Sequence, residues 1–219
     1  MILSDRQIRE AINNEEIIIN PFYEKQVQAA TYDLRVGNQG ATTSTKKIID
    51  IKKDGYLLLK PGDFAIITMF EELQLSNSYV GRFGLRSKYA RKGLIATTGP
   101  QIDPGYKGKI IIGLTNLTPK SVSIPYKDDF VSVEFHKLDE PCENPYNGPY
   151  QGKTELGPED IAMVVETESL SFSEVLTTLS SLSQNVGELA SDVRMLKWIM
   201  PIIVTFGIAI IAVIVSLQG

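Results

Sequence analysis

GYLLLKPGDFAIITMF, residues 55–70, sets the fold class, because two short apolar runs flank a Pro-Gly-Asp turn. Runs rich in β-branched and aromatic residues, bounded by turn residues, are typical of strands. The pattern recurs in SYVGRFGL (78–85), KGKIIIGLTNL (107–117) and DDFVSVEFHKL (128–138). Short strands separated by turn signals predict a mainly β fold, a barrel or sandwich, from residue 17 to about residue 138.

A short helix is predicted ahead of the strands. Ser4 and Gln7 form an S-x-x-Q capping box. Three apolar side chains with helical spacing follow it: Ile8, Ala11 and Ile12. After the strands, residues 139–158 are rich in Pro, Gly and Tyr, which predicts an irregular tail or lid. We therefore assign residues 1–157 to one β-barrel head.

Residues 158–197 form a second region, in which apolar residues recur at alternating spacings of three and four. They are Phe172, Val175, Leu179, Leu182, Val186, Leu189, Val193 and Leu196. This heptad pattern predicts a long helix that forms a coiled-coil stalk. The alternative is a single amphipathic helix folded back on the barrel, although a helix that faces a core normally shows a wider apolar stripe.

The third region, residues 198–217 (WIMPIIVTFGIAIIAVIVSL), contains no charged residue. About 20 apolar residues in a helix span the roughly 30 Å hydrocarbon core of a bilayer. The segment therefore predicts one transmembrane helix, a single-pass anchor in a lipid bilayer. Arg194 and Lys197 precede it, so the positive-inside rule predicts that the head lies on the cytoplasmic side.

The composition excludes several kinds of site. The chain of 219 residues has one Cys, one His and a formal net charge of −4. A single cysteine forms no disulfide within the chain, and the P-C-x-x-C motif of zinc deaminases is absent. An acidic chain lacks a general electrostatic attraction to DNA or RNA, so we expect no polymeric nucleic acid as a partner.

Two segments of the head carry residues suited to metal and phosphate binding. Asp33 follows Tyr32 in the strand-like run AATYDLRVGN. Its carboxylate is a candidate to hold Mg²⁺ through water, because hard cations prefer oxygen ligands. The run GRFGLRSKYARKGL concentrates positive charge in an acidic protein, and Arg and Ser side chains suit phosphate oxygens. Its candidate substrate-binding residues are Arg86, Ser87, Lys88 and Arg91.

A third segment, QIDPGYKGKIIIGLTN at residues 101–116, predicts a hairpin at a binding site. Gly105 lets the backbone come close to a ligand. A hairpin of this kind can read the edge of a pyrimidine with its backbone N–H and C=O groups. Asp103, at the start of the hairpin, is then placed to orient a water molecule or to bind the sugar.

Together the three segments resemble the family that contains dCTP deaminase and trimeric dUTPase. The likeness covers residues 1–155: MILSDRQIREAI…IIINPF is similar to the start of archaeal deaminases, and PYNGPYQGK to the tail that covers the nucleotide. AATYDL, LRSKYARKGL and QIDPGYKGKI resemble three successive motifs of the family. The resemblance implies a distorted β-barrel or jelly roll of the dUTPase-like type. It also implies a homotrimer, active sites between subunits, and a deoxyribonucleoside triphosphate bound with Mg²⁺.

The resemblance implies a role for each residue that matches a motif. Arg86 and Ser87 match the phosphate-binding pair, and Arg91 the second arginine of that motif. Asp33 matches the acid near the metal. Asp103 matches the aspartate that helps to activate water in dUTPases, and Tyr106 the aromatic position after the hairpin turn.

One departure from the family decides the expected chemistry. Its deaminases shuttle protons with a glutamate ten residues after the motif aspartate, and here that position is Gly113. Losing a general acid–base lowers a rate by about 10²–10⁴. We therefore expect hydrolysis of dUTP or a related nucleotide to the monophosphate and pyrophosphate, with Asp103 as the catalytic residue. The alternative is a catalytically silent nucleotide sensor or a structural trimer of a membrane complex, a defence system or a virion.

The oligomeric state is open between two signals. The family implies three chains, whereas Val at position a with Leu at position d, as at Val186 and Leu189, favours two-stranded coiled coils. We expect the head to bury more surface than the stalk, and therefore to make the chain a homotrimer.

Overall fold

The computed structural model describes residues 1–167, 178, 180–190, 193–197 and 199–200. The chain divides into two compact units, Met1–Ser171 and Phe172–Gly219. The first unit contains the strands of the head, and the described part of the second is helical. Each unit is described by itself.

The first unit is mainly β, as the sequence predicts. Its strands are β1 (Ile17–Asn20), β2 (Tyr32–Thr42), β3 (Ile49–Asp50), β4 (Tyr56–Leu59), β5 (Phe64–Leu75), β6 (Tyr79–Leu85), β7 (Leu94–Ala96), β8 (Gln101–Ile102), β9 (Lys107–Asn116), β10 (Val122–Pro125) and β11 (Asp129–Lys137). Its helices are α1 (Asp5–Asn13), α2 (Ile51–Asp54), α3 (Ser87–Ala90) and α4 (Pro158–Thr167), with one 3₁₀ turn at Glu24–Gln26.

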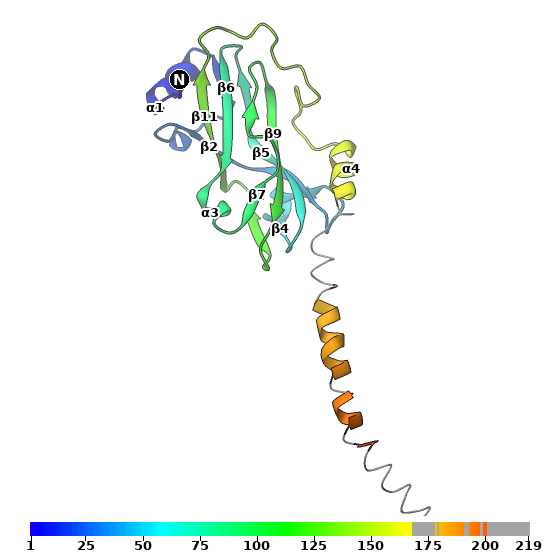
Figure 1. Cartoon of the computed structure of the whole chain (residues 1–219). Coiled ribbons are helices and arrows are strands. Elements are labelled where there is room, and N and C mark those ends of the chain that lie inside the picture. The colour runs from blue at the N-terminus through cyan, green and yellow to red at the C-terminus, as the bar shows by residue number, and fades with distance from the viewer. Residues whose placement is uncertain (168–177, 179, 191–192, 198, 201–219) are drawn as a thin grey trace, which may run out of the picture. The chain divides into compact units, whose positions relative to one another are not determined.

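Nine of the strands form one antiparallel sheet, in the order β7-β9-β5-β2-β11-β6-β8, with β1 paired to β5 and β3 to β2. The sheet curls into a half-barrel, with α1 near β11 and α4 on the side of β9 (Figure 1). Strands β10 and β4 form a separate pair. The predicted barrel is therefore confirmed as a curled antiparallel half-barrel.

Strand β2 joins the two halves of this sheet, because it pairs with β5 on one side and with β11 on the other. The β2–β5 ladder shifts register between Val36 and Gly40. Next to the shift, the buried carboxylate of Glu71 accepts hydrogen bonds from the backbone N–H of Arg35 at 2.9 Å and from its Nε at 2.7 Å. A side chain thus satisfies a buried backbone donor that the ladder leaves unpaired.

Side chains of β9 alternate between two faces, because successive residues of a strand point in opposite directions. Ile110, Ile112 and Leu114 belong to the main core. Ile111 faces a smaller apolar cluster, and Gly113 follows it on the same face of the strand. The face that carries Gly113 is therefore the one that the smaller cluster covers.

The N-terminal helix is confirmed with its predicted cap. The Ser4 hydroxyl accepts a hydrogen bond from the backbone N–H of Gln7, and the Gln7 side chain accepts one from Ser4 in return. Ile8 and Ala11 are buried in the main core. The cap satisfies two of the backbone N–H groups that a helix start leaves without partners.

Residues 139–157 contain no helix or strand, as predicted, and α4 follows them. Leu156 and Val164 are buried in the smaller cluster with Ala41 of β2 and Ile66 of β5. The head therefore extends past the predicted boundary at residue 157, because α4 packs on the sheet instead of beginning a separate stalk.

The second unit is helical at residues 180–190 and 193–197. Five side chains of the predicted heptad seam are between 50% and 67% exposed: Leu182, Val186, Leu189, Val193 and Leu196. The other seam positions, Phe172, Val175 and Leu179, lie outside the described residues.

The structure describes only Ile199 and Met200 of the predicted anchor, residues 198–217. Among the residues that the structure describes, no helix has the length and apolar character needed to cross a membrane. The rest of the predicted anchor lies outside the described residues.

The junction of β2 and β5 generates a stability prediction. A Cβ atom at Gly37 would lie 2.6 Å from the carbonyl oxygens of Met69 and Thr68, which are backbone and cannot move aside. We expect Gly37→Ala to lower the free energy of unfolding in urea by about 1–3 kcal/mol. Gly84→Ala is the control, because nothing lies within 4 Å of its Cβ position. We expect a change within about 0.5 kcal/mol there, and equal effects of the two substitutions would contradict the close crossing.

Candidate functional site

A cavity of about 470 Å³ lies on the face of the half-barrel that carries Gly113. Its lining combines apolar side chains with a few polar groups, which is the usual character of a small-molecule pocket. Phe64, Ile66, Phe83, Ile110 and Ile111 are among the apolar residues. Thr97, Thr98, Gln101 and Asp103 are among the polar ones.

The predicted hairpin forms one wall of the cavity. Asp103 lies at its start, and Oδ1 of Asp103 accepts a hydrogen bond from Gln101 Nε2 at 2.6 Å. Gly105 has φ +81°, and a Cβ there would lie 2.5 Å from Pro145, so the turn requires glycine. Tyr106 is buried and donates its hydroxyl to the carbonyl of Lys109 at 2.8 Å. Burial raises the pKa of Tyr106, which keeps this hydroxyl protonated. Three predicted site residues are thus brought together at the cavity.

Gly113 lies in the same cavity, and neighbouring side chains occupy the space beside it. The hydroxyl of Thr98 accepts the Gly113 backbone N–H at 2.6 Å. A Cβ at Gly113 would lie 2.6 Å from Thr97 Oγ1 and 3.2 Å from both Thr98 Oγ1 and the Phe64 ring. The cavity therefore has two hydroxyls and a phenyl ring around the position where a side chain at residue 113 would begin.

The predicted phosphate-binding residues form a second group, which does not line this cavity. Arg86, just before α3, forms an ion pair with Asp33 of β2. Asp33 is 1% exposed, and its other carboxylate oxygen accepts a hydrogen bond from Ser132 at 2.5 Å. Both oxygens of Asp33 therefore have partners within the chain. The ion pair holds the guanidinium of Arg86, the residue that follows the end of β6.

Lys88 is also engaged within the chain. Its Nζ lies 2.6 Å from Oδ2 of Asp128, and the hydroxyl of Tyr89 donates to the same carboxylate. Burial raises the pKa of Asp128, but the hydrogen bonds from Lys88 and Tyr89 outweigh it and leave that pKa below its ordinary value. Ser87 and Arg91 lie at the two ends of α3, and both are exposed. Of this group, Ser87 and Arg91 are the more accessible to a ligand.

The residues do not fit a protein-held metal at Asp33. Asp33 is 1% exposed and its two carboxylate oxygens contact Arg86 and Ser132, so a hydrated Mg²⁺ does not reach it without displacing one of those groups. Within the described residues, no three or more His, Cys, Asp or Glu side chains gather as a metal site would require. The prediction that Asp33 holds a metal ion is not supported by this arrangement.

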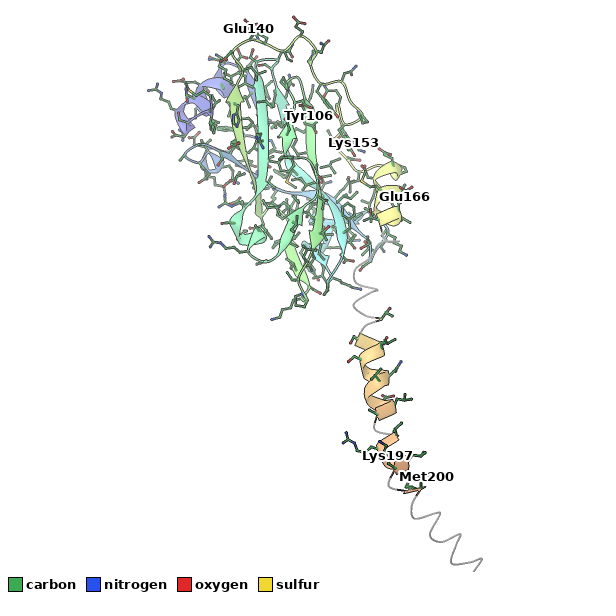
Figure 2. All side chains as sticks on the ribbon, viewed as in Figure 1. Tyr106, Glu140, Lys153, Glu166, Lys197 and Met200 are labelled. Atoms are coloured by element: carbon green, nitrogen blue, oxygen red, sulfur yellow. The ribbon has the colours of Figure 1, made fainter. Side chains whose placement is uncertain are left out.

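The tail, residues 139–157, lies along the hairpin and closes another side of the cavity. Gly152 donates its N–H to Lys107 at 2.7 Å, and Lys109 donates to the carbonyl of Lys153 at 2.8 Å. The Gln151 side chain accepts from the Lys107 N–H and donates to Gly105. Figure 2 shows Tyr106 and Lys153 on the side of the head that carries α4. The predicted lid is therefore bound to the hairpin of its own chain.

Besides Thr97, Thr98 and several apolar strand residues, sequence analysis did not name five residues that line the cavity: Tyr146, Tyr150, Asp160, Met163 and Thr167. The first two belong to the tail, whose Tyr content gave a weak signal. The other three belong to α4, which sequence analysis placed in the stalk region that begins at residue 158, although the heptad pattern itself begins at Phe172. Their spacing of three and four residues is the only sequence signal that places them on one face of a helix. The same spacing is typical of a coiled-coil stalk.

Known proteins share both the sequence and the fold of the head. A family model described as dCTP deaminase-like matches residues 2–138. The dCTP deaminase of Thermococcus sibiricus is 38% identical over 156 residues, which are 71% of this chain and 95% of that protein. A dUMP-forming dCTP deaminase of Aquifex aeolicus is 31% identical over 179 residues, covering 77% of this chain and 99% of that protein.

A solved structure, the 2′-deoxycytidine 5′-triphosphate deaminase of Agrobacterium tumefaciens, matches with a TM-score of 0.53 and 17% identity. The match covers 63% of this chain and 47% of that one, and it supports the dUTPase-like half-barrel fold. The chain belongs to the dCTP deaminase-like family. The resemblance predicted for residues 1–155 is thereby confirmed at the level of the family.

The surroundings of Gly113 generate a second prediction. We expect Gly113→Glu to lower the free energy of unfolding by about 1–3 kcal/mol, because the new side chain meets Thr97, Thr98 and Phe64. Adding Thr97→Ala removes the nearest atom, so the double variant should regain most of the loss in urea unfolding. Thr97→Ala alone is the control. A Gly113→Glu variant as stable as the parent would show that the space is open.

Proposed function

We propose that the head binds a deoxyribonucleoside triphosphate and hydrolyses dUTP, or a related nucleotide, to the monophosphate and pyrophosphate without deaminating the base. One observation carries this proposal: the cavity contains Asp103 beside the hairpin, but it has Gly113 where the family's deaminases are expected to carry their proton-shuttling glutamate. The volume of the cavity, about 470 Å³, suits a nucleoside.

Asp103 is the residue that acts on water in this proposal. Gln101 donates to Oδ1 of Asp103, which leaves Oδ2 to orient a water molecule. The water oxygen forms a bond to the α-phosphorus, and the bond from that phosphorus to the oxygen bridging it to the β-phosphate breaks. Pyrophosphate leaves, and Asp103 takes the proton of the water. No step transfers a proton to the base, so the reaction needs no acidic side chain at residue 113, where the chain has glycine.

The phosphate group is bound by Arg86, Ser87 and Arg91 of a neighbouring subunit. This part of the proposal is supported by the fact that these residues do not line the cavity of their own chain. A homotrimer with sites between subunits would bring the two groups together. Because the oxygens of Asp33 are engaged, Mg²⁺ would be held by the triphosphate and arrive with it.

A second function, a nucleotide-binding trimer without turnover, is favoured by the Asp33–Arg86 ion pair. That pair engages both the acid expected near the metal and an arginine expected on the phosphates.

We also propose that residues 198–217 anchor the chain in a lipid bilayer with the head on the cytoplasmic side. The exposed seam of the second unit supports a coiled-coil stalk above that anchor. A fixed location would suit a sensor more than an enzyme of the soluble nucleotide pool.

Turnover distinguishes the two functions. The full chain, solubilised in detergent, is incubated with dUTP, dCTP and Mg²⁺, and both pyrophosphate and ammonia are measured. We expect pyrophosphate without ammonia, and we expect Asp103→Asn to lower kcat by about 10²–10⁴ with little change in nucleotide affinity. Asp139→Asn, an exposed carboxylate outside the cavity, is the control. Tight binding without pyrophosphate would favour the sensor, and release of ammonia would overturn the proposal.

The oligomeric state provides a separate prediction. Because the proposed site takes its cavity from one chain and its phosphate-binding residues from a neighbouring chain, we expect residues 1–171 to form a trimer without the second unit. Light scattering coupled to size-exclusion chromatography measures the mass, with the full chain in detergent as the reference. If residues 1–171 are monomeric, no neighbouring subunit brings its phosphate-binding residues to the cavity. That result would contradict a site shared between subunits.

A further inference from the structure

Helix α4 lies outside residues 2–138, the part of the chain that matches the family, yet it forms a wall of the cavity. The residues that line the cavity are Asp160, Met163 and Thr167. Their spacing of three and four places them on one face of the helix. Met163 is 45% exposed, so apolar surface of α4 is open to whatever enters the cavity.

A neighbouring face of α4 fixes the helix to the sheet. Val164 is fully buried in the cluster with Leu156, Ala41 and Ile66, and Ile161 packs against the same cluster. Val165, the next residue, is 42% exposed. One turn of helix therefore contains a docking face, a face toward the cavity and a face toward solvent.

The start of α4 is held to the tail by charge. Lys153 Nζ lies 2.6 Å from Oδ2 of Asp160 and 2.7 Å from Oε1 of Glu159. Asp160 also accepts the backbone N–H of Gly157 at 2.7 Å. The carbonyl of Lys153 accepts from Lys109 of β9, so hairpin, tail and helix form one connected structure around the cavity.

We propose that α4 is part of the nucleotide-binding site, so that nucleotide binding and the docking of α4 on the sheet stabilise each other. This inference rests on the proposed function, because its ligand is the deoxyribonucleoside triphosphate. A ligand that fills the cavity covers Met163 and contacts Thr167, and it does so only while α4 is docked. Coupling of two equilibria is reciprocal: whatever loosens α4 weakens binding by the same factor by which the ligand tightens α4.

Helix α4 is the last helix of the first unit. The ligand would therefore determine how firmly the chain is held at the end of the head, before the C-terminal region begins.

Hydrogen exchange on the full chain in detergent tests the coupling. We expect saturating dUTP or dCTP with Mg²⁺ to slow exchange of the α4 amides by about tenfold, a coupling of ordinary size. Val164→Ala should weaken nucleotide affinity by about the same factor in calorimetry, because it loosens the docking face. Val165→Ala is the matched control, with the same chemical change on the exposed face, and it should bind like the parent.

The outcomes separate this inference from the function on which it rests. Absence of nucleotide binding by the parent chain would end both. Binding that leaves the α4 amides unchanged, with equal affinities for Val164→Ala and Val165→Ala, would end the inference alone. The exchange measurement on the parent chain needs no variant, so a Val164→Ala chain that fails to fold does not remove the test.

Discussion

The close passage of β2 over β5 is the constraint on which the head depends. Gly37 brings the two backbones together, and beside the register shift the buried Glu71 carboxylate accepts hydrogen bonds from the backbone N–H and the Nε of Arg35. Because β2 also pairs with β11, this junction fixes one half of the barrel relative to the other. Asp33, on the same strand, forms the ion pair with Arg86.

The site combines a retained cavity with altered chemistry. The hairpin, the tail and α4 enclose a space lined by Asp103 and two threonine hydroxyls, and Gly113 adds no acid to it. Binding a nucleotide needs shape, hydrogen bonds and charge, whereas deamination also needs a group that moves protons to the base. The cavity provides shape and hydrogen-bonding groups of the first kind, and residue 113 has no side chain that could move a proton.

The elements built from local signals were predictable, and the contacts between distant segments were not. The capping box of α1, the alternation in β9 and the glycine of the hairpin turn each depend on a few neighbouring residues. The Asp33–Arg86 and Lys88–Asp128 pairs join residues far apart in the chain, so no local pattern indicates them. The docking of α4 was missed because residues 158–167 were grouped with the predicted stalk, although the heptad pattern begins only at Phe172 and no local pattern indicates that Val164 contacts β2 and β5.

The described part of the second unit leaves eight large apolar side chains exposed: Leu182, Val186, Leu189, Val193, Met195, Leu196, Ile199 and Met200. A helix of this length is only marginally stable in isolation, since packing provides most of the stability of short helices. Its order would then be a property of the assembled protein and not of one chain. If protomers dissociated, the helix at residues 180–190 would lose any packing that covers these side chains, and its helical structure would be destabilised.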